Sequence, residues 1–312
     1  MSFLSRVVNS ELAAPGEPDG GIGVGARRVT GKEERRRIGS SLLERCSNPG
    51  CRSGWLHVWR RGSAPVFEGG WSCSFECTRQ LMTAAVRREQ EGRNSQSILH
   101  HHRIPLGLLM LEQGWITASQ LRCALDGQRS AGRGRIGEWL VRQGAADEQR
   151  VTRALALQWS CPVLPVDAES VGLSTMMPRL FVDAFGVLPL RFGAGRVLYL
   201  GFEEGLDRGL TLAMERMTAL RVESGVVQGS IFARVHERLL AAEFPHAELV
   251  EAASEAAAAY TLAKLIEQSR PLASRLARVH DCLWLRMWMS LPEDGVPAAD
   301  GVYDVICTIA GN

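Results

Sequence analysis

The sequence predicts an α+β multidomain protein, and three observations support that fold class. A segment with helical spacing occurs twice, 30 residues apart; four cysteines in two pairs precede it; short apolar runs alternate with amphipathic stretches after it. The chain has 312 residues, of which 46% are apolar, and this is long for one compact domain. We expect five consecutive parts: a disordered arm over 1–40, a zinc-binding domain over 41–95, a paired-repeat helical module over 96–160, a small α/β subdomain over 161–245, and a C-terminal helix with a β-hairpin over 246–312.

Composition excludes several classes of protein. The net charge of +2 favours no particular partner, and the first residues have no apolar core of signal-peptide length. No run of about 18 uncharged apolar residues occurs, so we expect a cytoplasmic protein without membrane insertion. In the glycine-rich arm, five residues separate Gly25 from Gly31-Lys32, and Glu33 follows. A phosphate-binding loop needs four residues there and then Ser or Thr, so we expect no nucleotide hydrolysis and no enzyme activity.

The cysteine-rich segment predicts a structural zinc site. The first two cysteines flank an Asn-Pro-Gly turn, the alternating run Trp55–Trp59 predicts a β-hairpin, and the second pair opens a helix over about 78–89. The arrangement resembles a treble-clef zinc finger, although its spacings of four and three residues depart from the commonest pattern. Buried cysteines without metal are the alternative. The predicted ligands are Cys46, Cys51, Cys73 and Cys77.

The repeated segment predicts four short helices in two αα-hairpins. Its apolar positions are three and four residues apart, Gly114 and Gly144 stop the first helix of each copy, and Thr117 with Gln120 forms a capping box. Asp147 caps the corresponding helix of the second copy. The first copy's Leu106, Gly107, Met110, Leu111, Gly114, Leu121, Leu125 and Gln128 match the second copy's Ile136, Gly137, Leu140, Val141, Gly144, Val151, Leu155 and Gln158. Two copies predict a pseudo-two-fold module suited to a ligand with two similar halves.

These two segments resemble the paired motif RLGxxLLxxGLLxxxxLxxxLxxQ in the N-terminal domain of type II secretion and type IV pilus assembly ATPases of the MshE/GspE type. In MshE-type members the paired motif binds cyclic di-GMP. The resemblance covers residues 103–160 and continues more loosely to about Leu240, without the ATPase domain. It implies a cyclic di-GMP site formed by Leu106, Gly107, Gly114, Leu121, Leu125, Gln128, Arg135, Ile136, Gly137, Leu140, Gly144, Val151, Leu155 and Gln158.

The chemistry of the ligand suits such a module, with one departure in the first copy. Cyclic di-GMP has two guanosine halves and two phosphates, so each repeat can address one half. Arg135 heads the second copy and offers a guanidinium for a phosphate or a purine face. The first copy has Pro105 at that position, which has neither charge nor donor. Whether Arg103 substitutes for it is open at this stage, and helix packing without a ligand is the alternative role of the module.

The remainder of the chain predicts a small sheet with helices on it. Apolar periodicity and turn residues predict helices over about 176–184, 206–217 and 230–242, and strands over 187–192, 197–202 and 220–227. An alanine-rich helix follows, and then two strands in 277–290 and 301–311. The run Trp284–Met289 is either a buried strand or an exposed partner surface. His280, Asp281 and Cys282 are consecutive, but no oxyanion feature accompanies them and we expect no catalysis.

The leading functional hypothesis is a non-catalytic receptor or adaptor that binds cyclic di-GMP and signals to an unidentified secretion, pilus or motility protein. One alternative is a nucleotide-free structural adaptor of a type II secretion or type IV pilus-like apparatus. Another is a nucleic-acid-binding regulator that uses the zinc domain, its flanking arginines, Trp55 and Trp59.

Overall fold

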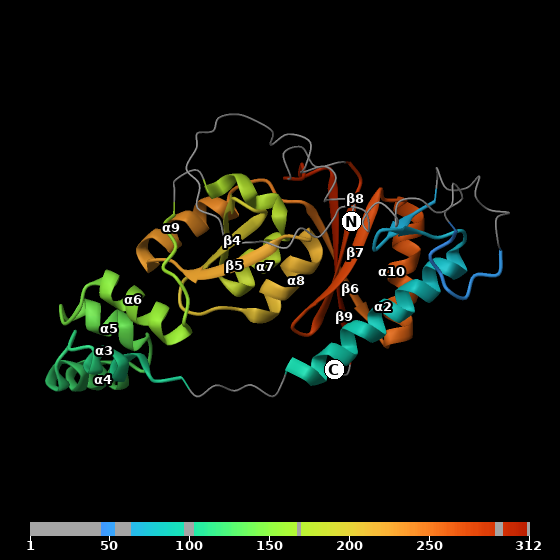
Figure 1. Cartoon of the computed structure of the whole chain (residues 1–312). Helices are drawn as coiled ribbons and strands as arrows, with labels where there is room; N and C mark the ends of the chain where they lie inside the picture. Colours follow the sequence, from blue (N-terminus) through green and yellow to red (C-terminus); the bar gives the residue numbers. More distant parts are fainter. Residues whose placement is uncertain (1–44, 54–63, 97–102, 167–169, 291–295, 311–312) are drawn as a thin grey trace, which may run out of the picture.

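The protein is described by a computed structural model for residues 45–53, 64–96, 103–166, 170–290 and 296–310. The expected arm over 1–40 and the run Trp55–Trp59 lie outside these residues. Within them the chain forms helices and three sheets, of two, three and four strands, which confirms the α+β class. The helices α3–α6 lie at one end of the molecule, α2 and α10 lie at the other, and the three-stranded and four-stranded sheets lie between (Figure 1).

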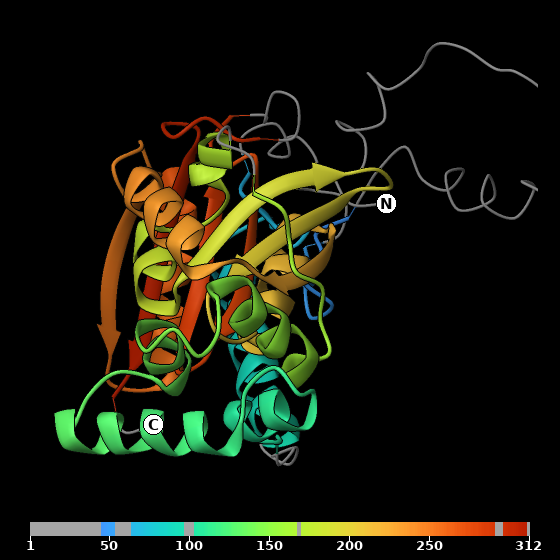
Figure 2. The ribbon, with the colours of Figure 1, turned by 90° about the vertical axis from the view of Figure 1, so that its left-hand side faces the viewer.

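The repeat module consists of the four short helices that the sequence predicts. They are α3 (Leu106–Glu112), α4 (Ala118–Ala131), α5 (Ile136–Arg142) and α6 (Glu148–Trp159). Thr117 and Gln120 form the expected capping box, and the side chain of Asp147 accepts the amide of Arg150 at the start of α6. Gly114 and Gly144 have positive φ angles, of 67° and 69°, where α3 and α5 end. Viewed from this end, the module lies in front of the remainder of the chain (Figure 2).

The matched glutamines hold the two repeats together reciprocally, and the matched glycines allow close packing within each repeat. Gln128 of the first copy donates to the carbonyl of Gly134 at 2.8 Å, just before the second copy, and Gln158 donates to that of Ile104 at 2.6 Å, just before the first. A Cβ on Gly107 would lie 2.6 Å from Leu121 Cδ1, and one on Gly137 would lie 2.8 Å from Val151 Cγ1. Close packing of the two helices within each repeat therefore favours glycine at both positions. The glutamine hydrogen bonds join one repeat to the other.

The α/β part follows the predicted order closely. Its elements are η3 (Ser170–Met176), α7 (Arg179–Phe185), β3 (Val187–Gly193), β4 (Val197–Phe202), α8 (Arg208–Thr218), β5 (Arg221–Val226) and α9 (Gly229–Leu240). Strands β3 and β4 are antiparallel, whereas β4 and β5 are parallel and joined through α8. The sheet order is β3-β4-β5. The amphipathic helices cover this small sheet, as the alternating pattern predicts.

The two predicted C-terminal strands pair antiparallel, as β8 and β9 below, but they belong to a four-stranded sheet rather than to an isolated hairpin. The elements are β6 (His246–Ala252), α10 (Glu255–Ser269), β7 (Ala273–Val279), β8 (Cys282–Trp288) and β9 (Val302–Ile309), in the order β6-β9-β8-β7. The run expected as one strand turns at His280, which has a φ of 51°, and yields both β7 and β8. Strand β6 was missed because it is mostly exposed or half-buried, so its sequence shows no apolar strand pattern.

This sheet is buried on both faces. Helices α2 (Phe75–Gln96) and α10 cover one face, where Leu285 and Met287 are buried, and the α/β elements cover the other, where Trp284 and Trp288 are buried. The run Trp284–Trp288 is therefore a buried strand, although Met289 beyond it is 39% exposed. One buried core joins residues 67–86 to residues 252–307, and the other joins residues 164–239 to residues 277–306. The expected five-part division therefore stays a prediction.

A buried ion pair joins β8 to β9 inside this core. The guanidinium of Arg286 donates to both oxygens of Asp304 at 2.8 Å, and the two side chains are 1% and 0% exposed. Trp284 Nε1 also donates to Asp304 at 2.8 Å, and Arg286 donates to the carbonyl of Met176 at 2.6 Å. Each of the two buried charges is thus neutralised by the other and also hydrogen-bonded to a further group, so removal of either side chain would leave an unpaired charge in the core.

The cysteine-rich part is short and continuous with the sheet. Strands β1 (Val66–Phe67) and β2 (Gly70–Trp71) form a small hairpin, and α2 begins at Phe75. Helix α2 runs to Gln96, past the predicted end at about residue 89 and into a polar stretch expected to be a linker. Among the described residues, no helix combines the length and apolar character needed to cross a bilayer.

Candidate functional site

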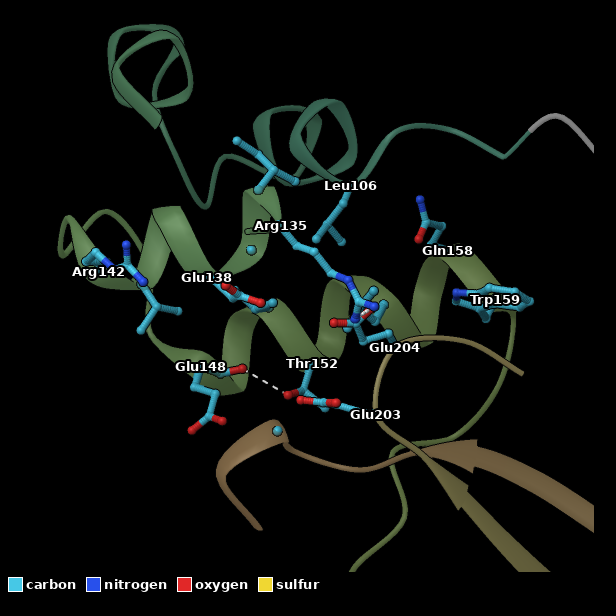
Figure 3. Close-up of a pocket in the computed structure, with 16 residues that line it drawn as sticks. Leu106, Arg135, Glu138, Arg142, Glu148, Thr152, Gln158, Trp159, Glu203 and Glu204 are labelled. Atoms are coloured by element: carbon cyan, nitrogen blue, oxygen red, sulfur yellow. Dashed lines mark hydrogen bonds and ion pairs between the residues drawn. The ribbon is translucent and has the colours of Figure 1, made fainter. Parts of the chain in front are cut away.

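A cavity of about 570 Å³ lies between the second repeat and the α/β part (Figure 3). Seven of the residues expected to bind the ligand line it: Leu106, Arg135, Ile136, Gly137, Val151, Leu155 and Gln158. The other lining residues are Glu138, Val141, Arg142, Glu148, Thr152, Trp159, Glu203, Glu204 and Gly229. The pocket therefore combines the second copy of the repeat with Leu106 of the first copy and with residues that follow β4 or begin α9.

The remaining expected site residues lie elsewhere in the module. Leu121 and Leu140 belong to its core, Leu125 packs against that core, and Gly107 is buried beneath Leu121. Gly114 and Gly144 end their helices, and Gln128 makes the hydrogen bond to Gly134 described above. The structure thus brings together most of the second-copy residues with Leu106 of the first copy, whereas the other first-copy residues, Leu140 and Gly144 have packing or helix-ending positions.

Arg135 occupies the N-cap of α5 at the rim of the pocket. Its guanidinium forms an ion pair with Glu204, which lies just after β4, and Figure 3 shows the side chain reaching across the pocket toward that carboxylate. The side chain of Arg135 is 64% exposed. Any anion that binds Arg135 must therefore compete with a carboxylate from the neighbouring α/β part.

Arg103 does not take the position that Pro105 leaves without charge. Its guanidinium carbon lies 3.2 Å from the centroid of the Trp159 ring, a cation–π contact. Trp159 itself lines the pocket, so Arg103 lies behind one of the pocket walls. The first copy thus contributes its arginine to the site indirectly, through the orientation of an aromatic ring.

Four carboxylates line the pocket against two guanidinium groups, so its charge is acidic. They belong to Glu138, Glu148, Glu203 and Glu204. Glu148 accepts from Gln228 Nε2 at 2.8 Å and from the hydroxyl and amide of Ser230, and so joins α6 to the start of α9. Burial raises the pKa of Glu203 above its usual value. The sequence of the repeat alone could not predict the acidic charge of the pocket, because Glu203 and Glu204 follow β4 in the α/β part.

The four predicted zinc ligands come together in one cluster. The sulfur atoms of Cys46, Cys51, Cys73 and Cys77 all lie within 4.8 Å of one another. The Cys51–Cys73 and Cys73–Cys77 sulfur distances are 3.5 and 3.6 Å. A tetrahedral zinc ion with bonds of about 2.3 Å separates its sulfur ligands by about 3.8 Å. The donor set therefore fits zinc, and four protein ligands would leave no open coordination position for catalysis.

The surroundings of these thiols also suit a bound cation. The amide of Cys73 donates to Cys46 Sγ at 3.4 Å, and hydrogen bonding to Ser53 lowers the pKa of Cys51 to about 6. Burial raises the pKa of Cys46 to about 12. Without a cation, the four-cysteine cluster would thus contain both neutral thiols and thiolates. Zinc binds all four cysteines as thiolates.

His280 has a defined partner that the local sequence did not indicate. Its Nε2 lies 2.6 Å from Asp207 Oδ2, and its ring stacks on Phe185 with centroids 4.9 Å apart. The hydrogen bond to Asp207 raises the pKa of His280. Asp207 also caps α8 by accepting the amide of Leu210, so this pair fixes the β7–β8 turn against the start of α8 rather than activating the nearby Cys282.

Comparison with known proteins gives structural similarity over part of the chain. No family model matches it, and no curated protein matches it. A solved structure described as MshE with cdg aligns with 44% of this chain and 99% of its own, at 23% identity and a TM-score of 0.36. Two crystal forms of the N-terminal domain of XpsE align with 43% and 41% of this chain and with 92% and 90% of theirs, at 19% identity and TM-scores of 0.30 and 0.24. The chain is thus similar to these structures over 41–44% of its length. Similarity of this extent does not indicate what this chain binds.

Proposed function

We propose that this chain is a non-catalytic, cytoplasmic receptor or adaptor that binds cyclic di-GMP and passes the signal to a protein of a secretion, pilus or motility apparatus. The observation that carries the proposal is Arg135 at the start of α5, on the rim of a cavity with the apolar side chains of the second repeat. The proposal includes structural zinc on Cys46, Cys51, Cys73 and Cys77 in a treble-clef-like segment.

The lining of the pocket offers complementary groups to one guanosine half of such a ligand. Ile136, Val151 and Leu155 provide apolar surface, and the Trp159 ring provides an aromatic wall. A guanine base carries N–H donors, which the carboxylates of Glu203 and Glu138 can accept. The phosphate pairs with the guanidinium of Arg135, with which it forms charge-assisted hydrogen bonds.

Competition between the phosphate and Glu204 supplies a way to transmit the signal. Glu204 belongs to the α/β part, whereas Arg135 belongs to the repeat module, and their ion pair links the two. A phosphate that takes Arg135 from Glu204 removes this link. Binding is then coupled to the contact between the two parts, because the ligand and the contact use the same guanidinium.

Calorimetric titration of cyclic di-GMP into the full chain tests the proposal. We expect saturable binding that is weakened about ten- to a hundred-fold in Arg135→Ala, the effect of losing a charged hydrogen bond worth about 1.5–3 kcal/mol. We expect Glu204→Gln to bind several-fold more tightly, because the competing carboxylate is gone. The matched control is Arg153→Ala, an exposed arginine of α6 that does not line this pocket. GTP and cyclic AMP serve as control ligands.

Two results would contradict the receptor proposal. One is the absence of binding up to about 1 mM, where the free energy of binding is only about 4 kcal/mol. The other is equal affinity in wild type, Arg135→Ala and Arg153→Ala, which would place any binding outside the pocket.

The excess of carboxylates in the pocket favours a second candidate, a structural adaptor that binds no nucleotide. Four glutamates against two arginines repel a dianionic ligand, and the Arg135–Glu204 ion pair then serves only to hold the module on the α/β part. In that case Glu204→Gln leaves the chain without nucleotide binding and weakens the contact between the two parts, measured by limited proteolysis. The nucleic-acid hypothesis rests on residues of the arm and on Trp55 and Trp59, which lie outside the described residues.

A further inference from the structure

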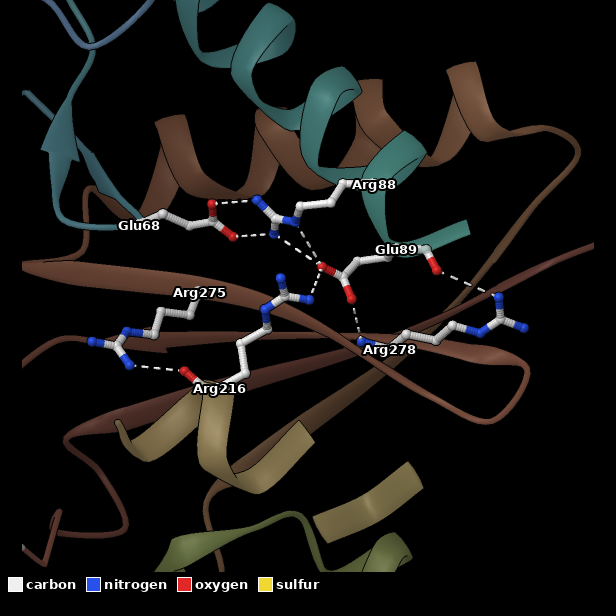
Figure 4. Close-up of polar contacts among 6 residues, drawn as sticks. All are labelled: Glu68, Arg88, Glu89, Arg216, Arg275 and Arg278. Atoms are coloured by element: carbon white, nitrogen blue, oxygen red, sulfur yellow. Dashed lines mark hydrogen bonds and ion pairs between the residues drawn. The ribbon is translucent and has the colours of Figure 1, made fainter. Parts of the chain in front are cut away.

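A second cavity of about 570 Å³ lies where α2, α8 and the end of β7 meet. Figure 4 shows the polar contacts among the charged residues there. No residue of the repeat module lines it, so it is separate from the site proposed above. It is lined by Arg88, Glu89, Gly92, Gly209, Leu212, Ala213, Glu215, Arg216, Ala277, Arg278 and His280. We call it the arginine cleft.

A buried carboxylate lies at the centre of the arginine cleft. Glu89 is 5% exposed, and its Oε1 accepts from Arg88 Nε at 3.0 Å and from Arg216 Nη1. Its Oε2 accepts from the backbone amide of Arg278 at 3.2 Å. The carboxylate of Glu89 thus holds two guanidinium groups, from α2 and α8, and a backbone amide of β7 around one point.

The guanidinium groups of Arg88 and Arg216, which both contact Glu89, differ in how many of their N–H donors are hydrogen-bonded. Glu68 binds Arg88 with both oxygens, at 2.8 and 2.5 Å. Within the described parts of the chain, Glu89 is the acceptor that the structure gives for the guanidinium of Arg216, and the Arg216 side chain is 45% exposed. A guanidinium has five N–H donors in a planar fork. Arg216 therefore keeps donors available on the open side of the cleft.

The walls of the cleft are lined by small residues on its two helices. Gly92 on α2 and Gly209 on α8 lie within helices, where glycine costs about 0.5–1 kcal/mol relative to alanine. Neither has a positive φ angle, and a Cβ on Gly92 would meet no heavy atom within 4 Å. Packing thus does not require glycine at position 92. The absence of a side chain there instead leaves space in the cleft.

Charge indicates the class of ligand. The lining holds three arginines and two glutamates, and the carboxylate of Glu215 accepts the amide of Val222 at 3.1 Å on the side of β5. Glu68 pairs with Arg88 and Asp281 with Arg278, whereas Arg216 shares Glu89 with Arg88, so Arg216 is the arginine best placed to bind an added anion. A phosphate group offers three oxygens and up to two charges, which can address donors from several elements at once, whereas a carboxylate offers two oxygens and one charge.

We propose that the arginine cleft is a binding site for a phosphomonoester group, with Arg216 as its principal ligand and Arg88 and Arg278 at its sides. The guanidinium of Arg216 binds the phosphate oxygens while Glu89 holds it in place. The phosphate can belong to a free small molecule or to a phosphorylated side chain, and both present the same group to the cleft.

Titration of inorganic phosphate and of phosphoserine into the full chain, at constant ionic strength, tests this assignment. We expect saturable binding that Arg216→Gln weakens at least ten-fold and that Arg216→Lys, which keeps the charge but loses the planar fork, weakens less. The control is Arg234→Gln, an exposed arginine in the middle of α9, with affinity unchanged. Tighter binding of phosphoserine than of phosphate would assign the site to a phosphorylated side chain, and the reverse order would assign it to a free phosphate.

Several outcomes would overturn the proposal. They are no binding to the wild-type chain up to about 10 mM phosphate, equal loss in Arg216→Gln and Arg234→Gln, or succinate binding as tightly as phosphate. If Arg216→Gln does not fold, Arg216→Lys and the wild-type titration still decide the matter. Cyclic di-GMP affinity should be the same in Arg216→Gln and wild type, so this proposal and the proposed function can fail independently.

Discussion

The module pocket and the arginine cleft have the same volume, about 570 Å³, and opposite charge. Four glutamates and two arginines line the first, whereas three arginines and two glutamates line the second. The pocket indicated by the repeated motif is thus the less favourable of the two for an anion. A sequence motif identifies one segment of the chain that lines a pocket, but the charge of the pocket also depends on residues from other segments.

The two regions also differ in how they are supported. The module pocket rests on α5 and α6, whose ends are fixed by local caps and by the glutamine hydrogen bonds. The arginine cleft depends on α2, whose start lies in the cysteine cluster and whose remaining length packs on α10. Perturbations of the cysteines, of the large sheet and of the repeat should therefore affect the two regions differently.

The largest expected effect comes from removal of zinc. Chelation, or the change Cys73→Ser, should free the start of α2 and abolish phosphate binding in the arginine cleft while cyclic di-GMP binding in the module is retained. Structural zinc sites contribute about 10–16 kcal/mol in small zinc peptides. Metal content measured by mass spectrometry and the two titrations test this. Cys123→Ser, at an exposed cysteine outside the cluster, is the control.

Full-length protein that is purified without zinc, yet has the same thermal stability and phosphate affinity, would contradict a structural role for the metal.

The next largest effect should follow from Arg286→Met in the buried ion pair. This change leaves the carboxylate of Asp304 buried without its cation, which typically costs about 3–5 kcal/mol. We expect the urea midpoint of the sheet region to fall while the helical signal of the repeat module persists. The double change with Asp304→Leu should recover part of the loss, because no buried charge then remains.

A single unfolding transition shared by all probes would show that the two regions do not unfold separately. The absence of rescue in the double variant would show that the unpaired charge of Asp304 is not the cause of the lost stability.

A smaller effect distinguishes the packing role of the matched glutamines from a role in ligand binding. Gln128→Leu and Gln158→Leu each remove one hydrogen bond between repeats, worth about 0.5–1.5 kcal/mol. The two variants should lose similar stability in urea unfolding. Only Gln158→Leu, which alters the pocket lining, should also change the affinity for cyclic di-GMP.

Equal effects of both variants on affinity would show that the ligand contacts the first repeat as well, in a two-sided site.

The smallest effect concerns pH and the turn between β7 and β8. The folded pKa of His280 is raised by its hydrogen bond to Asp207, above the value of about 6.5 in an unfolded chain. The contact therefore stabilises the fold fully below about pH 6.5, and this contribution is lost as the pH rises through the raised pKa. Thermal melts of wild type and His280→Gln across this range should converge at high pH.

A difference in melting temperature between wild type and His280→Gln that is the same at every pH would contradict a role for the charged form of His280. The variant Asp281→Asn is the control for the neighbouring carboxylate.

Local elements of the fold could be predicted because their determinants are close in sequence. The capping box of Thr117 and Gln120, the glycine stops at 114 and 144, and the order of the α/β elements all agree with the structure. The cysteine cluster was also predictable, since turn and helix chemistry place each pair. The C-terminal hairpin is present as β8 and β9, but β6 and β7 were missed because the turn at His280 and the exposed edge strand β6 carry no clear apolar signal.

The candidate site could be predicted only in part. Arg135 and the second-copy apolar residues were identified from the motif and do line a pocket. Glu203 and Glu204 follow β4, so no pattern within the repeat could show that they face Arg135. The same holds for Arg88, Arg216 and Arg278, which are far apart in the chain and meet only around Glu89.

By itself the sequence determined the helices of the repeat, their caps and the grouping of the four cysteines, because backbone hydrogen bonds and apolar periodicity act between near neighbours. Only the tertiary structure decided that the large sheet is buried on both faces, that Arg286 and Asp304 pair within it, and that one cavity is acidic and the other basic. Those properties depend on which distant charges share one low-dielectric space, and packing of the whole chain sets that arrangement.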